Sequence, residues 1–168
     1  MTQQAESLIQ KVNQILIQRK NREYVCHLED ECPEESIFIS YQKITIENIN
    51  LVFLKKLVML DTENEWIRWL QQGLNYGIDF TLRLGFEDVT LVPWQLLTKW
   101  PLHIISKNDK QLFVINKQHI TYTDVMLIKS EYQLVKLKTQ KLTDLALESL
   151  QKNNISISER IDSKCIWE

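Results

Sequence analysis

The stretch EWIRWLQQGLNYGIDFTLRLGFEDVTLVPWQLLTKW (65–100) decides how this chain is expected to fold. It contains four of the five tryptophans and all three glycines of the 168 residues. Residues 78–84 inside it alternate apolar and polar side chains without a break, which predicts a half-buried strand. The glycines Gly73, Gly77 and Gly85 lie too far apart to build a glycine-rich nucleotide loop, so we expect them at helix ends and turns.

The same stretch predicts a helix before this strand and a hairpin after it. Thr62 is followed three residues later by Glu65, a capping box whose side chains satisfy unpaired backbone N–H groups at the start of a helix. One of the first two glycines can end this helix. Gly85 is expected to turn the chain into a second strand over 89–92, and a proline predicts a short helix over 93–100.

Further elements are predicted on both sides of this stretch. An amphipathic N-terminal helix is indicated by apolar residues at spacings of three and four, namely Ala5, Leu8, Ile9, Val12, Ile15 and Leu16. Residues 46–60 are apolar nearly all round, so periodicity leaves helix or strand open and length favours a helix. The remaining predictions are strands over 22–28, 36–44, 102–106, 111–116, 120–128 and 132–138, and a helix over 141–151.

Together these elements predict an α+β fold. Strands follow one another in adjacent hairpins, which indicates a mainly antiparallel sheet. We expect the sheet to pack against the N-terminal helix, the central capped helix and the C-terminal helix. The predicted organisation is a single domain over 1–152 followed by a loosely held C-terminal tail over 153–168.

The composition restricts the class of protein. Apolar residues make up 44% and charged residues 25% of the chain, with a net charge of −2, which is typical of a soluble globular domain and unlike a general nucleic-acid binder. No apolar run reaches ~18 residues and no signal-peptide core is present, so no membrane contact is expected. Cys26, Cys32 and Cys165 form an odd set without CxxC spacing, which favours free thiols in the cytoplasm.

The sequence offers two candidate sites that could bind a metal. Cys26, His27 and Cys32, completed by His103 or His119, are possible zinc ligands, but neighbouring residues on a strand point to opposite faces. Asp79, Glu87 and Asp88, with Lys99 nearby, are the carboxylates available to a metal-dependent nuclease. No metal and no cofactor is expected from these spacings, and the nuclease is the alternative function.

Arg22 and His27 give a third catalytic alternative. Their R-x4-H spacing resembles the catalytic motif of HEPN ribonucleases, in which arginine and histidine act on a scissile phosphate. The resemblance covers two residues and implies an RNase activity. In that family the motif lies on a helix, whereas residues 22–28 are predicted here as a strand.

The favoured prediction is a non-enzymatic protein-interaction module, namely a regulator, adaptor or immunity-type partner. Tryptophan is enriched at binding hot spots because it offers a large rigid surface with one polar group. The acidic segment 29–35 and a basic late segment have opposite charges, which permits self-association or docking of a charged protein. The predicted contact residues are Trp66, Trp69, Trp94, Trp100, Lys136 and Lys138, and the partner is another protein or a second copy of the chain.

Overall fold

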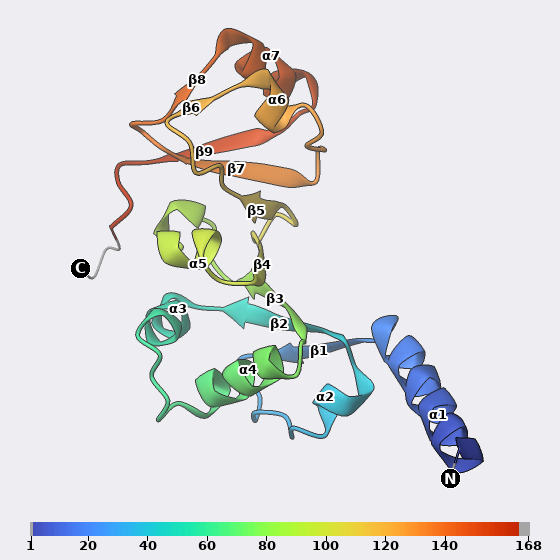
Figure 1. Cartoon of the computed structure of the whole chain (residues 1–168). Helices are drawn as coiled ribbons and strands as arrows, with labels where there is room; N and C mark the ends of the chain where they lie inside the picture. The colour runs from blue at the N-terminus through green and yellow to red at the C-terminus, as the bar shows by residue number, and fades with distance from the viewer. Residues whose placement is uncertain (1, 165–168) are drawn as a thin grey trace.

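The computed structural model describes residues 2–164, and the side chains from Glu6 onward (Figure 1). Along the chain it contains α1 (Thr2–Lys20), β1 (Glu23–His27), α2 (Ile37–Ser40), β2 (Lys43–Ile49), α3 (Leu51–Val58), α4 (Glu65–Asn75), β3 (Asp79–Leu84), the 3₁₀ turn η1 (Val89–Leu91), α5 (Trp94–Thr98), β4 (Leu102–Ile105), β5 (Gln111–Phe113), β6 (His119–Ile120), α6 (Tyr122–Val125), β7 (Tyr132–Leu137), β8 (Lys141–Leu142), α7 (Asp144–Lys152) and β9 (Ser156–Arg160). None of the helices in this range is long and apolar enough to cross a membrane.

The fold is α/β and is organised by a seven-stranded, mostly parallel sheet. Its strand order is β1-β2-β3-β4-β5-β7-β9, and β6 and β8 form a separate small pair. The first four strands are parallel to one another, and so are β5, β7 and β9. These two blocks meet at β4 and β5, which are antiparallel. The predicted mainly antiparallel sheet is therefore wrong, although the strands predicted over 102–106 and 111–116 do form an antiparallel pair.

The parallel connections were missed because their helices are short. Parallel neighbours need a crossover, usually a helix, between them. The helix α2 has four residues and lies inside 36–44, which was predicted as a strand. The stretch 46–60, predicted as one helix, begins in β2 and continues as α3. Asn50 divides them, because its side-chain oxygen accepts a hydrogen bond from Phe53 N at 2.9 Å and caps α3.

Within the opening stretch the helix and the strand are confirmed, but the hairpin is wrong. The helix α4 begins after Asn64, whose side chain accepts from Ile67 N at 3.2 Å, so the cap is Asn64 and not Thr62. After β3, residues 89–91 form η1 instead of a strand. Asp88 starts this turn, because its carboxylate accepts from Thr90 N at 3.0 Å.

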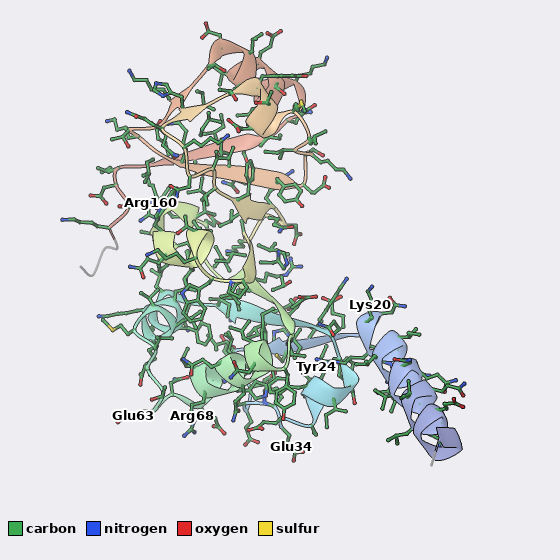
Figure 2. All side chains as sticks on the ribbon, viewed as in Figure 1. Lys20, Tyr24, Glu34, Glu63, Arg68 and Arg160 are labelled. Atoms are coloured by element: carbon green, nitrogen blue, oxygen red, sulfur yellow. The ribbon has the colours of Figure 1, made fainter. Side chains whose placement is uncertain are left out.

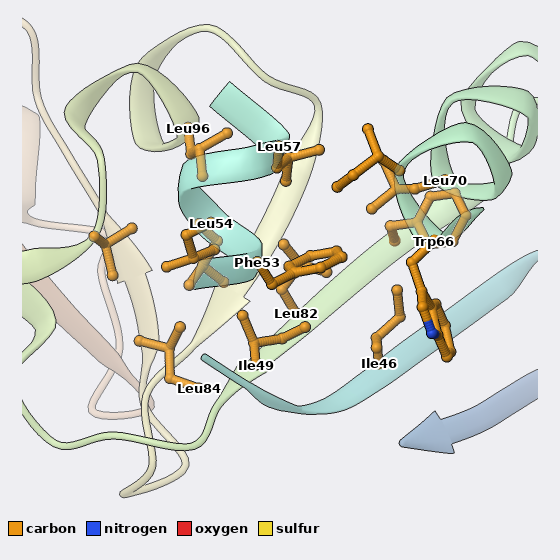
Figure 3. Close-up of a cluster of buried hydrophobic side chains, with 14 of the residues drawn as sticks. Ile46, Ile49, Phe53, Leu54, Leu57, Trp66, Leu70, Leu82, Leu84 and Leu96 are labelled. Carbon is orange, nitrogen blue, oxygen red and sulfur yellow. The ribbon is translucent and has the colours of Figure 1, made fainter. Parts of the chain in front are cut away.

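The apolar side chains of the sheet form two separate clusters. Alternate residues of β2 and β3 point into the larger cluster, beneath α3 and α4, with Ile46, Ile49, Leu82 and Leu84 among them (Figure 3). On β7, Val135 belongs to the larger cluster and its neighbour Leu134 to the smaller one, under α6 and α7. Since neighbouring residues of a strand point to opposite faces, the two clusters lie on opposite faces of one sheet.

This arrangement follows from the handedness of crossover connections. A strand–crossover–strand unit is right-handed in nearly all proteins. Because β1 to β4 are consecutive neighbours that run the same way, their crossovers all cover one face. The second block runs the opposite way, so the same handedness places α6 and α7 on the other face. The second face of β1–β4 therefore has no helical cover within residues 2–164.

The ends of the chain also differ from expectation. Residues 156–160 of the predicted loose tail form β9, which pairs with β7 in the sheet. The strand predicted over 120–128 is replaced by α6 after the two residues of β6. The N-terminal helix was expected to pack on the sheet, but every side chain from Glu6 to Gln18 is exposed. Figure 1 shows α1 projecting away from the rest of the molecule.

A substitution at Gly73 tests how closely α4 packs on β3. A Cβ at this position would overlap Cζ of Phe80 and lie 2.6 Å from its Cε2 and 3.1 Å from Cε1 of Phe38, and both rings are fully buried. We expect Gly73→Ala to lower the free energy of unfolding by about 1–3 kcal/mol, because the rings cannot move without strain. Urea denaturation of the wild type and the variant measures this difference in the free energy of unfolding. The exposed neighbour is the control, and Gln72→Ala should change stability by less than about 0.5 kcal/mol.

Candidate functional site

The tryptophans predicted to dock a partner lie in the core. Trp66, Trp69 and Trp94 are only 9%, 3% and 9% exposed, and Trp100 is half-buried against the same cluster. The ring of Trp69 packs against Phe38 at 4.9 Å between centroids and contacts two further aromatic rings. The predicted tryptophan surface is therefore not a surface, and these rings hold α4 and α5 against the sheet.

The nuclease carboxylates are not brought together. Asp79 begins β3, whereas Glu87 and Asp88 follow the other end of this six-residue strand, roughly 20 Å away. Glu87 lies 3.6 Å from Lys107 Nζ, and Asp88 is occupied in capping η1. Two acidic groups that share a divalent cation must both reach it within a few ångströms. The positions of these three carboxylates therefore do not give the geometry that the nuclease alternative needs.

The other catalytic and metal candidates are also separated or inert. Arg22 and His27 lie at opposite ends of β1, roughly 16 Å apart, and not on one helix. Burial raises the pKa of both the Cys26 and the Cys32 thiols to about 12, so both are protonated at neutral pH. Cys165 lies outside the described residues. Among residues 2–164 no group of three His, Cys, Asp or Glu side chains could hold a metal.

A polar cluster on the uncovered face of β1–β4 was not foreseen. Glu47 on β2 lies 3.6 Å from His27 Nδ1 and 3.5 Å from Arg83 Nε, and Arg83 also pairs with Asp109. The cluster lies at the carboxyl ends of parallel strands, where open α/β sheets bind ligands. Its members are paired with one another and at least a third exposed, apart from Glu47 at 32%, so they form a solvated ion-pair network.

A shallow hollow of about 660 Å³ lies between the loop after β1 and α4. Its charged lining consists of three glutamates, Glu34, Glu35 and Glu65, and one arginine, Arg68. Figure 2 labels Glu34 and Arg68. The buried indole N–H of Trp69, which also lines it, has no hydrogen-bond partner among the described residues. Mixed charge and wide opening leave this hollow without a recognisable ligand chemistry.

The two predicted basic contacts have different environments. Lys138 is exposed, but Lys136 is 6% exposed and its ammonium group donates to the carbonyls of Leu137 and Gln140, both at 3.1 Å. It also donates to Glu159 on β9. Lys136 therefore ties the C-terminal strand to β7 and cannot contact a partner.

Exposed apolar side chains occur at several places on the body, such as Val52, Leu127 and Leu145, but α1 carries a row of them on a single helix. We define the α1 stripe as Leu8, Ile9, Val12, Ile15 and Leu16, which are 65%, 59%, 46%, 52% and 50% exposed. At 100° per residue these five side chains occupy an arc of about 120° on the helix. Glutamines, asparagine, serine and charged residues fill most of the remaining surface. Figure 2 shows the drawn side chains of α1 extending into open space below Lys20, which is labelled at the C-terminal end of the helix.

The helix α1 is anchored at one end. Arg19 donates to the carbonyls of Tyr41 at 3.2 Å and Tyr76 at 2.9 Å. Only Asn21 and Arg22 separate it from β1. An isolated helix of this length is marginal in water, and most helices in proteins depend on packing of an apolar face. The stripe is therefore an unfilled packing surface, and its periodicity was visible in the sequence although its exposure was not.

Comparison with known proteins gives one result. A family model described as putative propanediol utilisation matches residues 7–156. The match covers most of the 168 residues, so the chain belongs to this family. It begins before the α1 stripe and ends at the start of β9. No curated protein and no solved structure matches the chain.

The role of Lys136 can be tested against the exposed Lys138, which lies just after the end of the same strand. We expect Lys136→Met to lower the free energy of unfolding by about 2 kcal/mol, because two buried carbonyls and a carboxylate lose their donor. Lys138→Met should have an effect below about 0.5 kcal/mol. Equal effects of the two substitutions in urea denaturation at neutral pH would contradict the assignment.

The same ion pair predicts a pH dependence. Hydrogen bonding from Lys136 lowers the pKa of Glu159 in the folded protein. Its contribution to stability is therefore complete above the ordinary pKa range of a glutamate and is lost as the pH falls through the lowered folded-state value. We expect stability to fall more steeply with acidification in the wild type than in Lys136→Met. Urea denaturation curves of both proteins at a series of pH values from 7 downward measure this difference in pH dependence.

Proposed function

Starting from membership of the putative propanediol utilisation family, we propose that the chain is a non-enzymatic protein-interaction component of that process, acting in the cytoplasm. Its docking element is α1. The body behind α1, made of the seven-stranded sheet and its two cores, is the platform that carries this helix.

The exposed α1 stripe is the observation that carries the proposal. Five aliphatic side chains, each about half exposed or more, lie on one arc of a helix whose side chains from Glu6 to Gln18 all face solvent. Burying one such side chain contributes roughly 1.5–3 kcal/mol, so a partner that covers the stripe gains a large gross stabilisation. Part of this gain is offset by the loss of freedom on association.

The distribution of reactive groups supports a role without catalysis. The carboxylates of the nuclease alternative lie at opposite ends of β3. The thiols of Cys26 and Cys32 have a raised pKa and are protonated at neutral pH. An active site requires an acid, a base or a nucleophile within hydrogen-bond reach of a common point. In the polar cluster around Glu47 the charged groups form ion pairs with one another, although Arg83 Nε has no hydrogen-bond partner among the described residues.

The location of the stripe within the family match adds a second argument. The matched range, 7–156, includes the whole stripe as well as both cores. The family is thus defined by the helix and the platform together. A docking helix and its platform form one functional unit in this interpretation.

The proposal is tested by capture of proteins from cells that metabolise propanediol, with this chain as tagged bait and a differently tagged second copy present. The double variant Leu8→Asp with Leu16→Asp places two charges in the α1 stripe. We expect it to retain the wild-type partner at least roughly tenfold less well, because the charges would have to be buried.

The matched control is the double variant Gln10→Asp with Gln14→Asp, which adds the same charge on the opposite side of α1. It should retain the partner as well as the wild type, and both double variants should keep the thermal unfolding temperature of the body. Equal retention by the stripe variant and the control variant would overturn the proposal.

A further inference from the structure

We propose that the partner of α1 is a second copy of this chain, and that the two helices pack antiparallel about a two-fold axis through Val12. This inference rests on the proposed function and names its partner. The product is a dimer in which the two bodies lie at opposite ends of a short helical pair.

The α1 stripe is symmetric about its centre. Val12 is the middle residue, Ile9 and Ile15 lie three positions to either side, and Leu8 and Leu16 lie four positions to either side. When two such helices pair antiparallel with Val12 opposite Val12, leucine meets leucine and isoleucine meets isoleucine. A two-fold interface must be complementary to itself, and this palindrome meets that requirement.

The charges of α1 fit the same arrangement. Glu6 and Lys20 lie along the same margin of the stripe, at helical angles of about 240° and 200° on a wheel where Val12 is at 120°. In the antiparallel pair each Glu6 comes opposite the Lys20 of the other copy. Antiparallel helix dipoles also attract, so both electrostatic contributions favour this orientation.

The position of the body favours the antiparallel orientation. Only Asn21 and Arg22 lie between α1 and β1, and Arg19 fixes the C-terminal end of the helix to the body. Packed helices lie about 8–10 Å apart. Two bodies, each roughly 30 Å or more across, would crowd each other if both emerged at one end of a pair. The antiparallel pair separates them by the length of α1, about 28 Å.

The size of the contact is sufficient for a dimer. A pair of helices about 28 Å long and 10 Å wide buries on the order of 1,000 Å² in total, which is the lower limit for a specific interface. Such an interface predicts a dimer in equilibrium with the monomer and not an obligate one. Its apolar centre and polar margins have the usual arrangement of a specific contact.

The uncovered face of β1–β4 is a poorer match for the stripe. Its apolar side chains are Val25 and Ile105, set among charged and hydroxyl groups such as Thr81, Arg83 and His103. Covering it with α1 would leave these polar groups without water or a partner, which costs free energy. The stripe therefore matches its own copy better than it matches this face.

The dimer is tested first by sedimentation equilibrium of the full chain over about a hundredfold range of concentration. We expect the wild type to shift from monomer to dimer, and Val12→Asp to weaken dimerisation by about a hundredfold or more, because two carboxylates meet at the axis. Gln14→Asp, on the far side of α1, should dimerise like the wild type. A wild type that is monomeric throughout overturns the inference.

The orientation is tested with single cysteines and a short bis-maleimide crosslinker, with the wild-type chain as the background for its own thiols. Differently tagged Leu8→Cys and Leu16→Cys copies should crosslink to each other when mixed. Leu8→Cys alone should not crosslink above background, because its equivalent in the other copy lies about 12 Å away along the axis. Efficient Leu8→Cys self-crosslinking overturns the antiparallel pair.

These outcomes separate the inference from the proposed function. A monomeric wild type whose stripe variant still loses a different captured protein overturns the second copy as partner and leaves the docking role of α1 standing. A monomeric wild type whose capture is indifferent to the stripe overturns both. A dimer that survives Val12→Asp overturns the helix pair as its interface.

Discussion

The reversal of strand direction between β4 and β5 is the constraint on which the rest of the structure depends. It divides one sheet into two parallel blocks, and right-handed crossovers then place the helices of each block on opposite faces. The two hydrophobic cores are a consequence, since Leu134 and Val135, neighbours on β7, point into different ones. Arg160 reinforces the junction from β9, where its guanidinium donates to Val92 O at 2.6 Å and lies over the ring of Trp94.

This division of the sheet determines which surfaces are available for function. The aromatic residues of the α4–α5 region, Trp69 among them, pack between the helices and the covered face of the sheet. They are therefore not available to a partner. The uncovered face of β1–β4 is largely polar and carries the ion pairs around Glu47. The apolar surface of α1 has no such compensation. The proposed protein–protein contact would cover this apolar surface, whereas the sheet face offers much less apolar area to cover.

The sequence predicted local structure well wherever a periodic pattern was long enough. The alternation in residues 78–84 gave β3, and the wheel around Trp66 and Leu70 gave α4. Strand direction could not be predicted, because α2 has four residues and β2 runs into α3 through Asn50 alone, so the crossovers looked like strands or one long helix. Burial of Trp69 and Lys136 depends on contacts with Phe80 and Glu159, distant in the chain, which no local pattern contains.

The helix α1 joins this structural argument to function. Its segment contains no glycine or proline, but it has β-branched residues such as Val12 and Ile15 that lower helix propensity, and its polar face carries few i,i+4 ion pairs to compensate. A helix with this composition depends on burial of its stripe for stability. The anchor at Arg19 fixes the C-terminal turn, whereas the turns around Leu8 and Val12 would gain packing contacts only in the proposed dimer. In the proposed dimer, the stability of α1 and the binding of the second copy are therefore coupled.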